Sequence, residues 1–445
     1  MHQPKERIAR YFVHMNKDDF DFVPLQGLRI GLFVDLDVGW MAHPFPSSRF
    51  KITTDRHIEI LKGLGVEQIR YVPSKSDAPQ EPTDVEQARL DQERANQALA
   101  MESAQQALQL QQGRVALRIR QQKDLAICEQ RFSESAQQYH RTIGMLHTKP
   151  IEAAQQCQTM VHALSSEIQQ QGDIAIRLLT EVAGDKAALH PVNVTIISLL
   201  LARAMGVQGV DLEDLGMAAF LHDMGKTALP ERVRRLEENF SSAEVKVYQD
   251  HVNQGVRLAK QMELRPGVIQ TIAQHHELAD GSGFPDHLKL DAQSIGARIV
   301  AVVNRYDGLC NPSKPGAAMT PHEALATIFA QQKTRFDSAT LSAFIRMMGV
   351  YPPGSVVQLN DERHAIVVAV NAARPLKPRV IVHEPAIPRH EAVVLDLEHA
   401  PNASIRRSLK PSSLPPAAQD YLQPRPRIYY YFESAHNSAA QARPG

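Results

Sequence analysis

The sequence predicts a mainly α-helical protein. Its largest part is a helical bundle with an internal metal site, with a small α+β domain ahead of it and a small β appendage after it. Two observations lead to this prediction. Apolar residues recur with helical spacing over much of residues 181–348. Two pairs of adjacent metal-ligating residues, His222-Asp223 and His275-His276, lie where such periodic stretches end.

Composition narrows the class of protein. A chain of 445 residues can hold two to four domains, and 43% hydrophobic with 22% charged residues is ordinary for a globular protein. The net charge of +0 argues against a nucleic acid polymer as partner. The three cysteines show no CxxC spacing, which indicates a reducing compartment. Residues 1–21 lack the apolar core of a signal peptide, and the longest mainly apolar run, Ile196–Ala202, cannot span a bilayer. We therefore expect a cytoplasmic protein without a membrane partner.

Residues 1–77 are predicted to form a small, regulatory α+β domain. Residues 28–34 and 69–73 have the composition of strands. Between them, Ile58, Leu61 and Leu64 have helical spacing, and Gly65 marks the end of that helix. His43 precedes a proline in this domain, and a loop or core histidine is favoured over a metal ligand there.

Residues 78–180 are rich in Ala, Gln, Glu and Arg and are predicted to be a long helical linker or dimerisation region. Leu90, Gln97, Ala104 and Leu108 form only a loose heptad, which does not establish a coiled coil. A solvated helix pair is favoured over a signalling helix because the apolar seam is weak. Whether the protein forms a homodimer through this region is left open by the sequence.

The helical bundle is predicted over residues 181–348. One helix follows His190-Pro191, since proline is favoured in a first helical turn. Later apolar stretches end at His222-Asp223, at His275 and at Asn304. Each candidate ligand therefore lies at or near a helix end.

The end of the chain changes character. Residues 349–393 contain three short strand candidates, which predict a small β appendage. Residues 394–445 are dominated by Pro, Ser, Ala and Arg, which predicts a disordered tail. An aromatic run at residues 429–432 could dock back onto the protein.

The residues themselves point to metal chemistry. Two adjacent ionisable groups at each of two sites seldom serve packing alone, so His222, Asp223, His275 and His276 are predicted ligands. His190 and His251 are single histidines, so the sequence predicts them as metal ligands with less support. Sites rich in imidazole suit iron, manganese, zinc or nickel better than magnesium or calcium.

These motifs resemble those of the HD-GYP domain, a branch of the HD-type metal-dependent phosphohydrolases. The shared elements span roughly residues 185–345 and comprise His190, His222-Asp223-Met224-Gly225-Lys226, His251, His275-His276-Glu277 and Asp280–Pro285. In addition, residues 40–53, within roughly residues 22–77, resemble a domain of unknown function that often precedes a phosphodiesterase domain. The resemblance implies hydrolysis of cyclic di-GMP to pGpG, with further cutting to GMP left open, at a binuclear or trinuclear iron or manganese centre.

The resemblance also implies roles for individual residues. Asp223 would bridge two metals, with His190 and His222 on the first metal. His251, His275 and His276 would bind the second metal. Lys226 would offset charge on the phosphate, and Glu277 would orient a ligand imidazole. The predicted substrate-binding residues are Lys226, Asp280, Gly281, Gly283, Phe284 and Pro285.

Three residues depart from the family pattern. Phe284 replaces the family's tyrosine, so the ring is kept and the hydroxyl is lost. Asn304 replaces an aspartate ligand and would be a weak or absent ligand, unless Asp307 one turn later compensates. Lys186 replaces the glutamate of trinuclear members, so we expect at most two divalent transition metals.

Three hypotheses follow from these motifs. The leading one is a cyclic di-GMP phosphodiesterase. It is favoured over the scaffold because the chain retains His222, Asp223, Lys226, His251, His275 and His276. The second is a catalytically weak or inactive HD-GYP protein that acts as a cyclic di-GMP sensor or as a scaffold for signalling proteins such as diguanylate cyclases. Asn304 and Phe284 motivate this alternative. The third is an HD hydrolase with a different nucleotide substrate.

Overall fold

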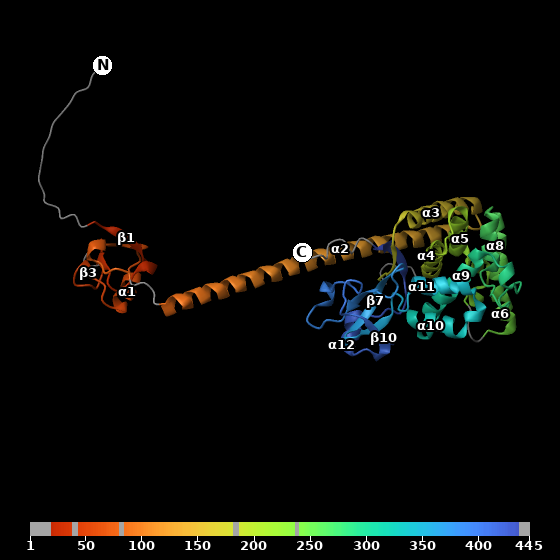
Figure 1. Ribbon diagram of the computed structural model, residues 1–445. Coiled ribbons are helices and arrows are strands. Elements are labelled where there is room, and N and C mark those ends of the chain that lie inside the picture. Colours follow the sequence, from red (N-terminus) through yellow and green to blue (C-terminus); the bar gives the residue numbers. More distant parts are fainter. Residues whose placement is uncertain (1–18, 38–42, 80–83, 181–186, 236–239, 436–445) are drawn as a thin grey trace, which may run out of the picture. The chain divides into compact units, whose positions relative to one another are not determined.

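The structure is a computed structural model that describes residues 19–37, 43–79, 84–180, 187–235 and 240–435 (Figure 1). It contains two compact units, Met1–Gln106 and Ala107–Gly445. All described residues of the predicted metal site belong to the second unit. Lys186 and Trp40 lie outside the described residues.

The N-terminal unit contains a four-stranded antiparallel sheet in the order β1-β4-β2-β3. Its strands are β1 (Asp21–Pro24), β2 (Phe33–Asp35), β3 (Arg49–Lys51) and β4 (Gln68–Tyr71). Helix α1 (Asp55–Lys62) places Leu61 in the core beside Val34 and Ile52. The predicted small α+β domain is therefore confirmed.

Two local predictions can be compared with this unit. The strand predicted from residue 28 begins only at Phe33, because Leu25–Gly27 forms a 3-10 turn and Gly31 has a φ of +95°. His43 is buried, and its Nε2 lies 3.1 Å from Ser48 Oγ while its Nδ1 accepts from the N–H of Phe45. It is a packed loop histidine, as the sequence favoured.

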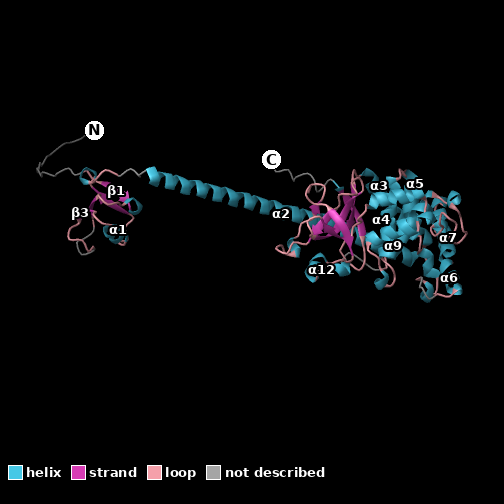
Figure 2. Ribbon diagram, turned by 60° about the horizontal axis from the view of Figure 1, so that its bottom comes forward, coloured by secondary structure: helices cyan, strands magenta, loops and turns pink. Residues whose placement is uncertain are grey.

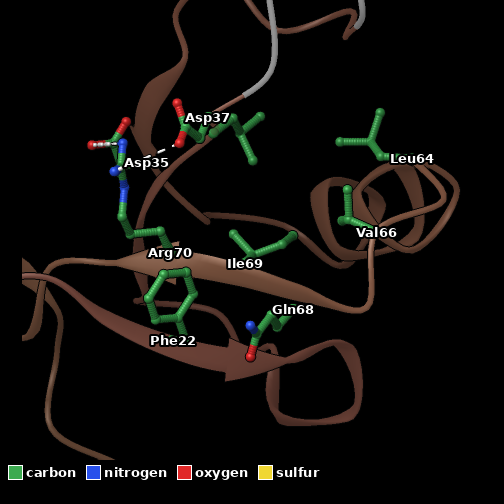
Figure 3. A pocket seen from close by; sticks show the side chains of 9 residues that line it. Phe22, Asp35, Asp37, Leu64, Val66, Gln68, Ile69 and Arg70 are labelled. Atoms are coloured by element: carbon green, nitrogen blue, oxygen red, sulfur yellow. Dashed lines mark hydrogen bonds and ion pairs between the residues drawn. The ribbon is translucent and has the colours of Figure 1, made fainter.

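A small hollow in the N-terminal unit is lined by Phe22, Leu64 and Arg70, among other residues (Figure 3). The guanidinium of Arg70 lies 3.2 Å from a carboxylate oxygen of Asp35 and 3.8 Å from one of Asp37. The hollow shares no residue with the predicted metal site.

Two long helices replace most of the predicted linker. Helix α2 (Asp84–Met145) exposes apolar side chains such as Leu99 in its first half and buries Phe132 near its end. Helix α3 (Pro150–Gln170) buries Val161 and Ile168 and contacts α4 and α5 of the bundle. The prediction of a solvated helix pair is therefore wrong for α3, whose apolar stripe completes the bundle core. The homodimer stays a prediction.

The helical bundle is built around α4, with α5, α8 and α9 against one another and α7 against α8. The bounds are α4 (Leu189–Ala204), α5 (Gly209–Leu221), α6 (Ser242–Gln249), α7 (His251–Gln261), α8 (Pro266–Gln274), α9 (Ile295–Cys310), α10 (Pro321–Gln331) and α11 (Ser338–Met348). Helix α4 is buried on all sides from Pro191 to Ala202, as expected for the central helix of a bundle. Within the described ranges, no helix combines the length and the apolarity needed to cross a bilayer.

A seven-stranded antiparallel sheet forms one block beside the bundle (Figure 2). Its main path runs β10-β6-β7-β5-β11, and β8 and β9 extend from β7. The strands are β5 (Ile174–Leu178), β6 (Val356–Leu359), β7 (His364–Asn371), β8 (Arg379–Val382), β9 (Leu395–Asp396), β10 (Ile405–Leu409) and β11 (Tyr430–Ser434). The predicted β appendage is thus confirmed, and it is larger than the sequence indicated.

Two of its strands correct the sequence analysis. Strand β5 lies in the segment predicted to be all helical, and β11 lies in the tail predicted to be disordered. The disorder prediction is wrong for residues 395–434, which also form β9, β10 and helix α12 (Pro416–Leu422). Residues 436–445 lie outside the described residues. Strands β5 and β11 pair with each other, from Tyr430 opposite Leu178 to Ser434 opposite Ile174, so the aromatic run does dock back. The predicted boundaries at residues 77, 180, 348 and 393 stay predictions.

Candidate metal centre

The predicted ligands converge because they lie at helix ends that meet inside the bundle. His222 follows the last residue of α5, and Asp223 immediately precedes the 3-10 turn η4 (Met224–Ala228). His251 begins α7, and His275 follows the last residue of α8. His190 lies in the first turn of α4. Contacts between α5 and α8, α7 and α8, and α7 and η4 bring these ends together.

One group of ligand atoms surrounds the first oxygen of Asp223. It contains Asp223, His251, His275 and His276, whose ligand atoms lie within 4.8 Å of one another. Nε2 of His251 is 3.5 Å and Nε2 of His275 is 3.9 Å from Asp223 Oδ1. The two Nε2 atoms are 3.4 Å apart.

A second group surrounds the other oxygen of Asp223. Nε2 of His190 lies 3.6 Å and Nε2 of His222 lies 3.5 Å from Asp223 Oδ2. These two nitrogens are 3.2 Å apart. The carboxylate of Asp223 thus directs one oxygen to each group, which is the arrangement expected of a bridging ligand.

Main-chain carbonyls orient three of the imidazoles. The Nδ1 atoms of His222, His251 and His275 lie 2.6 to 2.7 Å from the carbonyl oxygens of Ala219, Tyr248 and Ile272. In each case the acceptor is three residues earlier in the chain. Nδ1 therefore carries the proton and Nε2 presents its lone pair to the cluster, which is the state a metal ligand needs.

Two polar atoms in the cluster lack a partner that a metal could supply. Asp223 Oδ1 and His276 Nε2 are buried and have no hydrogen-bond partner among the described residues. An unpaired buried polar atom is costly, and both atoms belong to the first group of ligands. A divalent cation bound there would satisfy both atoms, so the residues present fit a metal.

Burial favours the neutral form of three of the imidazoles. It lowers the pKa of His222 to about 4, and it holds the pKa values of His275 and His276 well below the usual range. Neighbouring imidazoles add to the shift of both. Neutral histidine is the form that binds metal, so the site is prepared for a cation at neutral pH.

Asp223 and Lys226 form a buried ion pair. Nζ of Lys226 lies 2.6 Å from Asp223 Oδ2. Burial opposes ionisation of Asp223, but the charge of Lys226 and the surrounding imidazoles hold the pKa of its carboxyl well below the usual range. Burial likewise disfavours the ammonium of Lys226, yet Asp223 and Tyr248 raise the pKa of the lysine. Both groups therefore stay charged at neutral pH.

Gly225 explains why this motif needs a glycine. A Cβ at this position would lie 2.0 Å from the carbonyl oxygen of His251 and 2.4 Å from the nitrogen of Gly255. Only a residue without a side chain lets η4 approach the main chain of α7 this closely. That approach sets Asp223 beside His251.

The predicted substrate loop covers the cluster through its aromatic ring. The ring of Phe284 stacks on that of His276, with centroids 4.4 Å apart. A Cβ on Gly283 would meet the main chain of His276, Glu277 and Leu278 at 2.4 to 2.6 Å. Asp280 accepts from the N–H and hydroxyl of Ser282, so it shapes the turn. The role of this loop in substrate binding stays a prediction.

Glu277 has a different contact from the predicted one. Its two carboxylate oxygens accept from the N–H groups of Asp286, at 2.7 Å, and Leu288, at 2.9 Å. Among the described residues it makes no hydrogen bond to an imidazole. Its role in orienting a ligand stays a prediction. The buried carboxylate fixes the end of the substrate loop.

Asp307 does not take the place of the missing aspartate ligand at Asn304. It lies one turn after Asn304 on α9, and its Oδ2 is 2.6 Å from Nδ1 of His190, on the side of that ring away from the cluster. Asp307 therefore supports a ligand from behind. Asn304 is half-buried, and its weak ligand role stays a prediction.

Sequence reasoning missed two asparagines that hold Asp307. Asn193 and Asn311 each donate to Asp307 Oδ1, at 2.8 and 2.9 Å. Asn193 stands in a largely apolar helix, and a buried amide there requires partners. That signal was available in the sequence, but it did not identify the partner.

Two family models match this chain. Residues 22–176 match a domain of unknown function, DUF3391, and residues 179–340 match the HD domain. The first match extends about a hundred residues beyond the segment in which the sequence showed the resemblance, through α2 and α3 to β5.

Two known relatives are similar to this chain. The cyclic di-GMP phosphodiesterase PA4108 of Pseudomonas aeruginosa is 25% identical over 364 residues, which cover 81% of this chain and 84% of that protein. The cyclic di-GMP phosphodiesterase response regulator RpfG of Xanthomonas campestris is 34% identical over 150 residues, which cover 33% of this chain and 39% of that protein.

Among solved structures, Bd1817, an HD-GYP-type protein of Bdellovibrio bacteriovorus, covers 73% of this chain and 98% of its own, with a TM-score of 0.38 and 15% identity. The two family matches carry the assignment, and the ligand cluster lies inside the second of them. The chain therefore contains an HD domain with a DUF3391 domain ahead of it.

Proposed function

We propose that this protein is a metal-dependent phosphodiesterase that hydrolyses cyclic di-GMP to pGpG. The observation that carries the proposal is the position of Asp223, whose two oxygens face two separate groups of imidazoles. Relatives that act on cyclic di-GMP support the choice of substrate.

Two transition metals, iron or manganese, are the proposed cofactors. His190, His222 and Asp223 would hold one, and Asp223, His251, His275 and His276 would hold the other. Bound metals of this kind lower the pKa of water and polarise phosphoryl oxygens. The absence of cysteine ligands and the number of imidazoles suit these ions.

The protein's own residues would position and stabilise the phosphodiester. Lys226 stays protonated beside Asp223, and a quarter of its side chain is exposed. It can therefore pair with a non-bridging phosphate oxygen and offset the charge that grows there. In the reaction one P–O bond to a ribose oxygen breaks, water supplies the new oxygen on phosphorus, and the ribose oxygen leaves with a proton.

The loop from Asp280 to Pro285 is the proposed wall of the substrate site. Phe284 lies against His276, so a nucleotide entering beside the cluster would meet an aromatic ring and a main chain held by Glu277. A ring without a hydroxyl can stack on a base or a ribose but cannot donate a hydrogen bond.

The alternative is a weak or inactive protein that senses cyclic di-GMP or serves as a scaffold for partners such as diguanylate cyclases. Asn304 favours it, because an amide oxygen is a weaker ligand than a carboxylate. The two candidates differ in metal content and in turnover.

The test is to purify the full chain anaerobically with iron or manganese, count bound metal and follow cyclic di-GMP by chromatography. We expect about two metals per chain and pGpG as a product. Asp223→Ala should lose both, whereas Asp211→Ala, a change of an exposed aspartate on α5, should lose neither. If the folded wild-type protein binds no metal and shows no turnover, the proposal that it is an enzyme is rejected. If the protein hydrolyses a different cyclic dinucleotide but not cyclic di-GMP, the proposed substrate is wrong.

A further inference from the structure

His190 is the one imidazole of the second ligand group that is oriented by a carboxylate. Its Nε2 faces His222 and Asp223, and its Nδ1 lies 2.6 Å from Asp307 Oδ2. A carboxylate behind a ligand imidazole fixes the tautomer and the ring orientation and makes the ligand more basic.

Asp307 is itself held from the other side. It is 2% exposed, and its Oδ1 accepts from the side-chain amides of Asn193 on α4 and of Asn311 just after α9. A buried carboxylate with both oxygens engaged has one orientation available. Its contact with His190 is therefore fixed by the two asparagines.

The same two amides bind the main chain of the C-terminal segment. Asn193 and Asn311 each donate to the carbonyl oxygen of Ile428, at 2.8 and 3.0 Å. In return, Asn311 Oδ1 accepts from the N–H of Ile428 at 2.8 Å, and Asn193 Oδ1 accepts from the N–H of Tyr430 at 2.9 Å. Each amide group thus joins Asp307 to the segment that leads into β11.

Strand β11 is firmly attached. It pairs along its whole length with β5, and Leu179 donates to the carbonyl of Tyr429. The guanidinium of Arg379 lies 3.0 Å from Glu433 and donates to the carbonyl of Ala435 at 2.6 Å. The segment is therefore a fixed platform for the two asparagines.

We infer that Asp307 is the positioning residue of His190, and that the main chain of Ile428–Tyr430, through Asn193 and Asn311, sets the affinity of the metal position that His190 serves. The C-terminal segment is then a part of the metal centre, although no residue of it touches a ligand. This inference rests on the proposed function only in its premise that His190 binds a metal.

The test uses the full chain without substrate and measures Mn²⁺ binding to the metal-free protein by calorimetry. Asp307→Asn keeps the shape but replaces one carboxylate oxygen with NH₂, which must face either His190 or the two donor amides. We expect one of two Mn²⁺ affinities to fall roughly 10- to 100-fold, while the other stays unchanged. Asn311→Ala, which leaves Asp307 in place, should weaken the same position.

Tyr430→Phe is the matched control. It removes a hydroxyl that bonds Tyr306 and the carbonyl of Pro353 but keeps the N–H that binds Asn193. Its Mn²⁺ affinities should equal those of the wild type, and thermal unfolding of each metal-free variant checks the fold. The inference is overturned if folded Asp307→Asn and Asn311→Ala bind both Mn²⁺ ions with wild-type affinity. It is also overturned if Tyr430→Phe lowers the Mn²⁺ affinity as much as these two variants do. Failure of the wild type to cleave cyclic di-GMP, with this binding pattern intact, would reject the proposed function and leave the inference standing.

Discussion

The ring of Phe284 stacks on the imidazole of His276, with an angle of 21° between their planes. An aromatic ring therefore covers a predicted metal ligand at the position where the family has a tyrosine. The contact depends on the ring and not on a hydroxyl, which leads to the first prediction.

Phe284→Ala should lower kcat/KM for cyclic di-GMP roughly 2- to 10-fold, because a stacked aromatic pair contributes about 0.5–1.5 kcal/mol. Phe284→Tyr should stay within about twofold of the wild type, since it keeps the ring. Initial rates over a range of substrate concentrations measure both. Equal rates for the alanine variant and the wild type would show that the stack does not matter for turnover.

Lys226→Met should lower kcat about 10²- to 10³-fold, as expected when a charged donor to a developing phosphate charge is removed. Bound metal should stay near the wild-type level, because Asp223 keeps its carboxylate. Metal analysis and single-turnover rates on the same preparation measure the two effects. Lys260→Met, at an exposed position on α7, is the control. Loss of metal together with activity would instead give Lys226 a role in assembling the site.

The metal-free protein should become less stable as the pH falls from about 6.5 to about 4. The pKa of His222 is lowered to about 4 in the folded protein, so below pH 6.5 the unfolded chain binds a proton that the folded one does not. His222 alone should remove on the order of 2 kcal/mol at pH 5. His275 and His276 act in the same direction, whereas His190, whose pKa Asp307 raises against the effect of burial, acts in the opposite one.

Urea unfolding at pH 7 and pH 5 in the presence of a chelator measures this loss. His222→Asn should show a smaller difference between the two pH values than the wild type. A free energy of unfolding that is the same at both pH values would contradict the assignment of neutral, buried imidazoles.

Gly225→Ala should destabilise the protein by about 1–3 kcal/mol or more and reduce metal binding, because the new methyl group would collide with the main chain of α7. Gly113→Ala is a matched change in open space on α2 and should raise stability by up to about 1 kcal/mol. Thermal unfolding and metal content distinguish the two. A Gly225→Ala protein with normal metal content would show that η4 can move away from α7 without loss of the site.

The sequence by itself determined which residues can bind metal and roughly where they lie. Apolar spacing placed His222 and His275 at helix ends, and the packing of those helices does bring them together. Such periodicity is a local signal, because residues on one face of a helix are close in sequence. The bundle, the small α+β domain and the existence of the β appendage were predicted for the same reason.

Only the tertiary structure decided the partners of Asp307, Glu277 and the C-terminal segment. Strands β5 and β11 lie about 250 residues apart in the chain, so neither carries a local sign of the other. A composition rich in proline and serine predicted disorder, but long-range pairing and burial of aromatic side chains stabilise the segment instead. Asp307 could be placed on α9 from the sequence. Its contact with His190 requires α4, α9 and the C-terminal strand to meet, and that depends on contacts between distant parts of the chain.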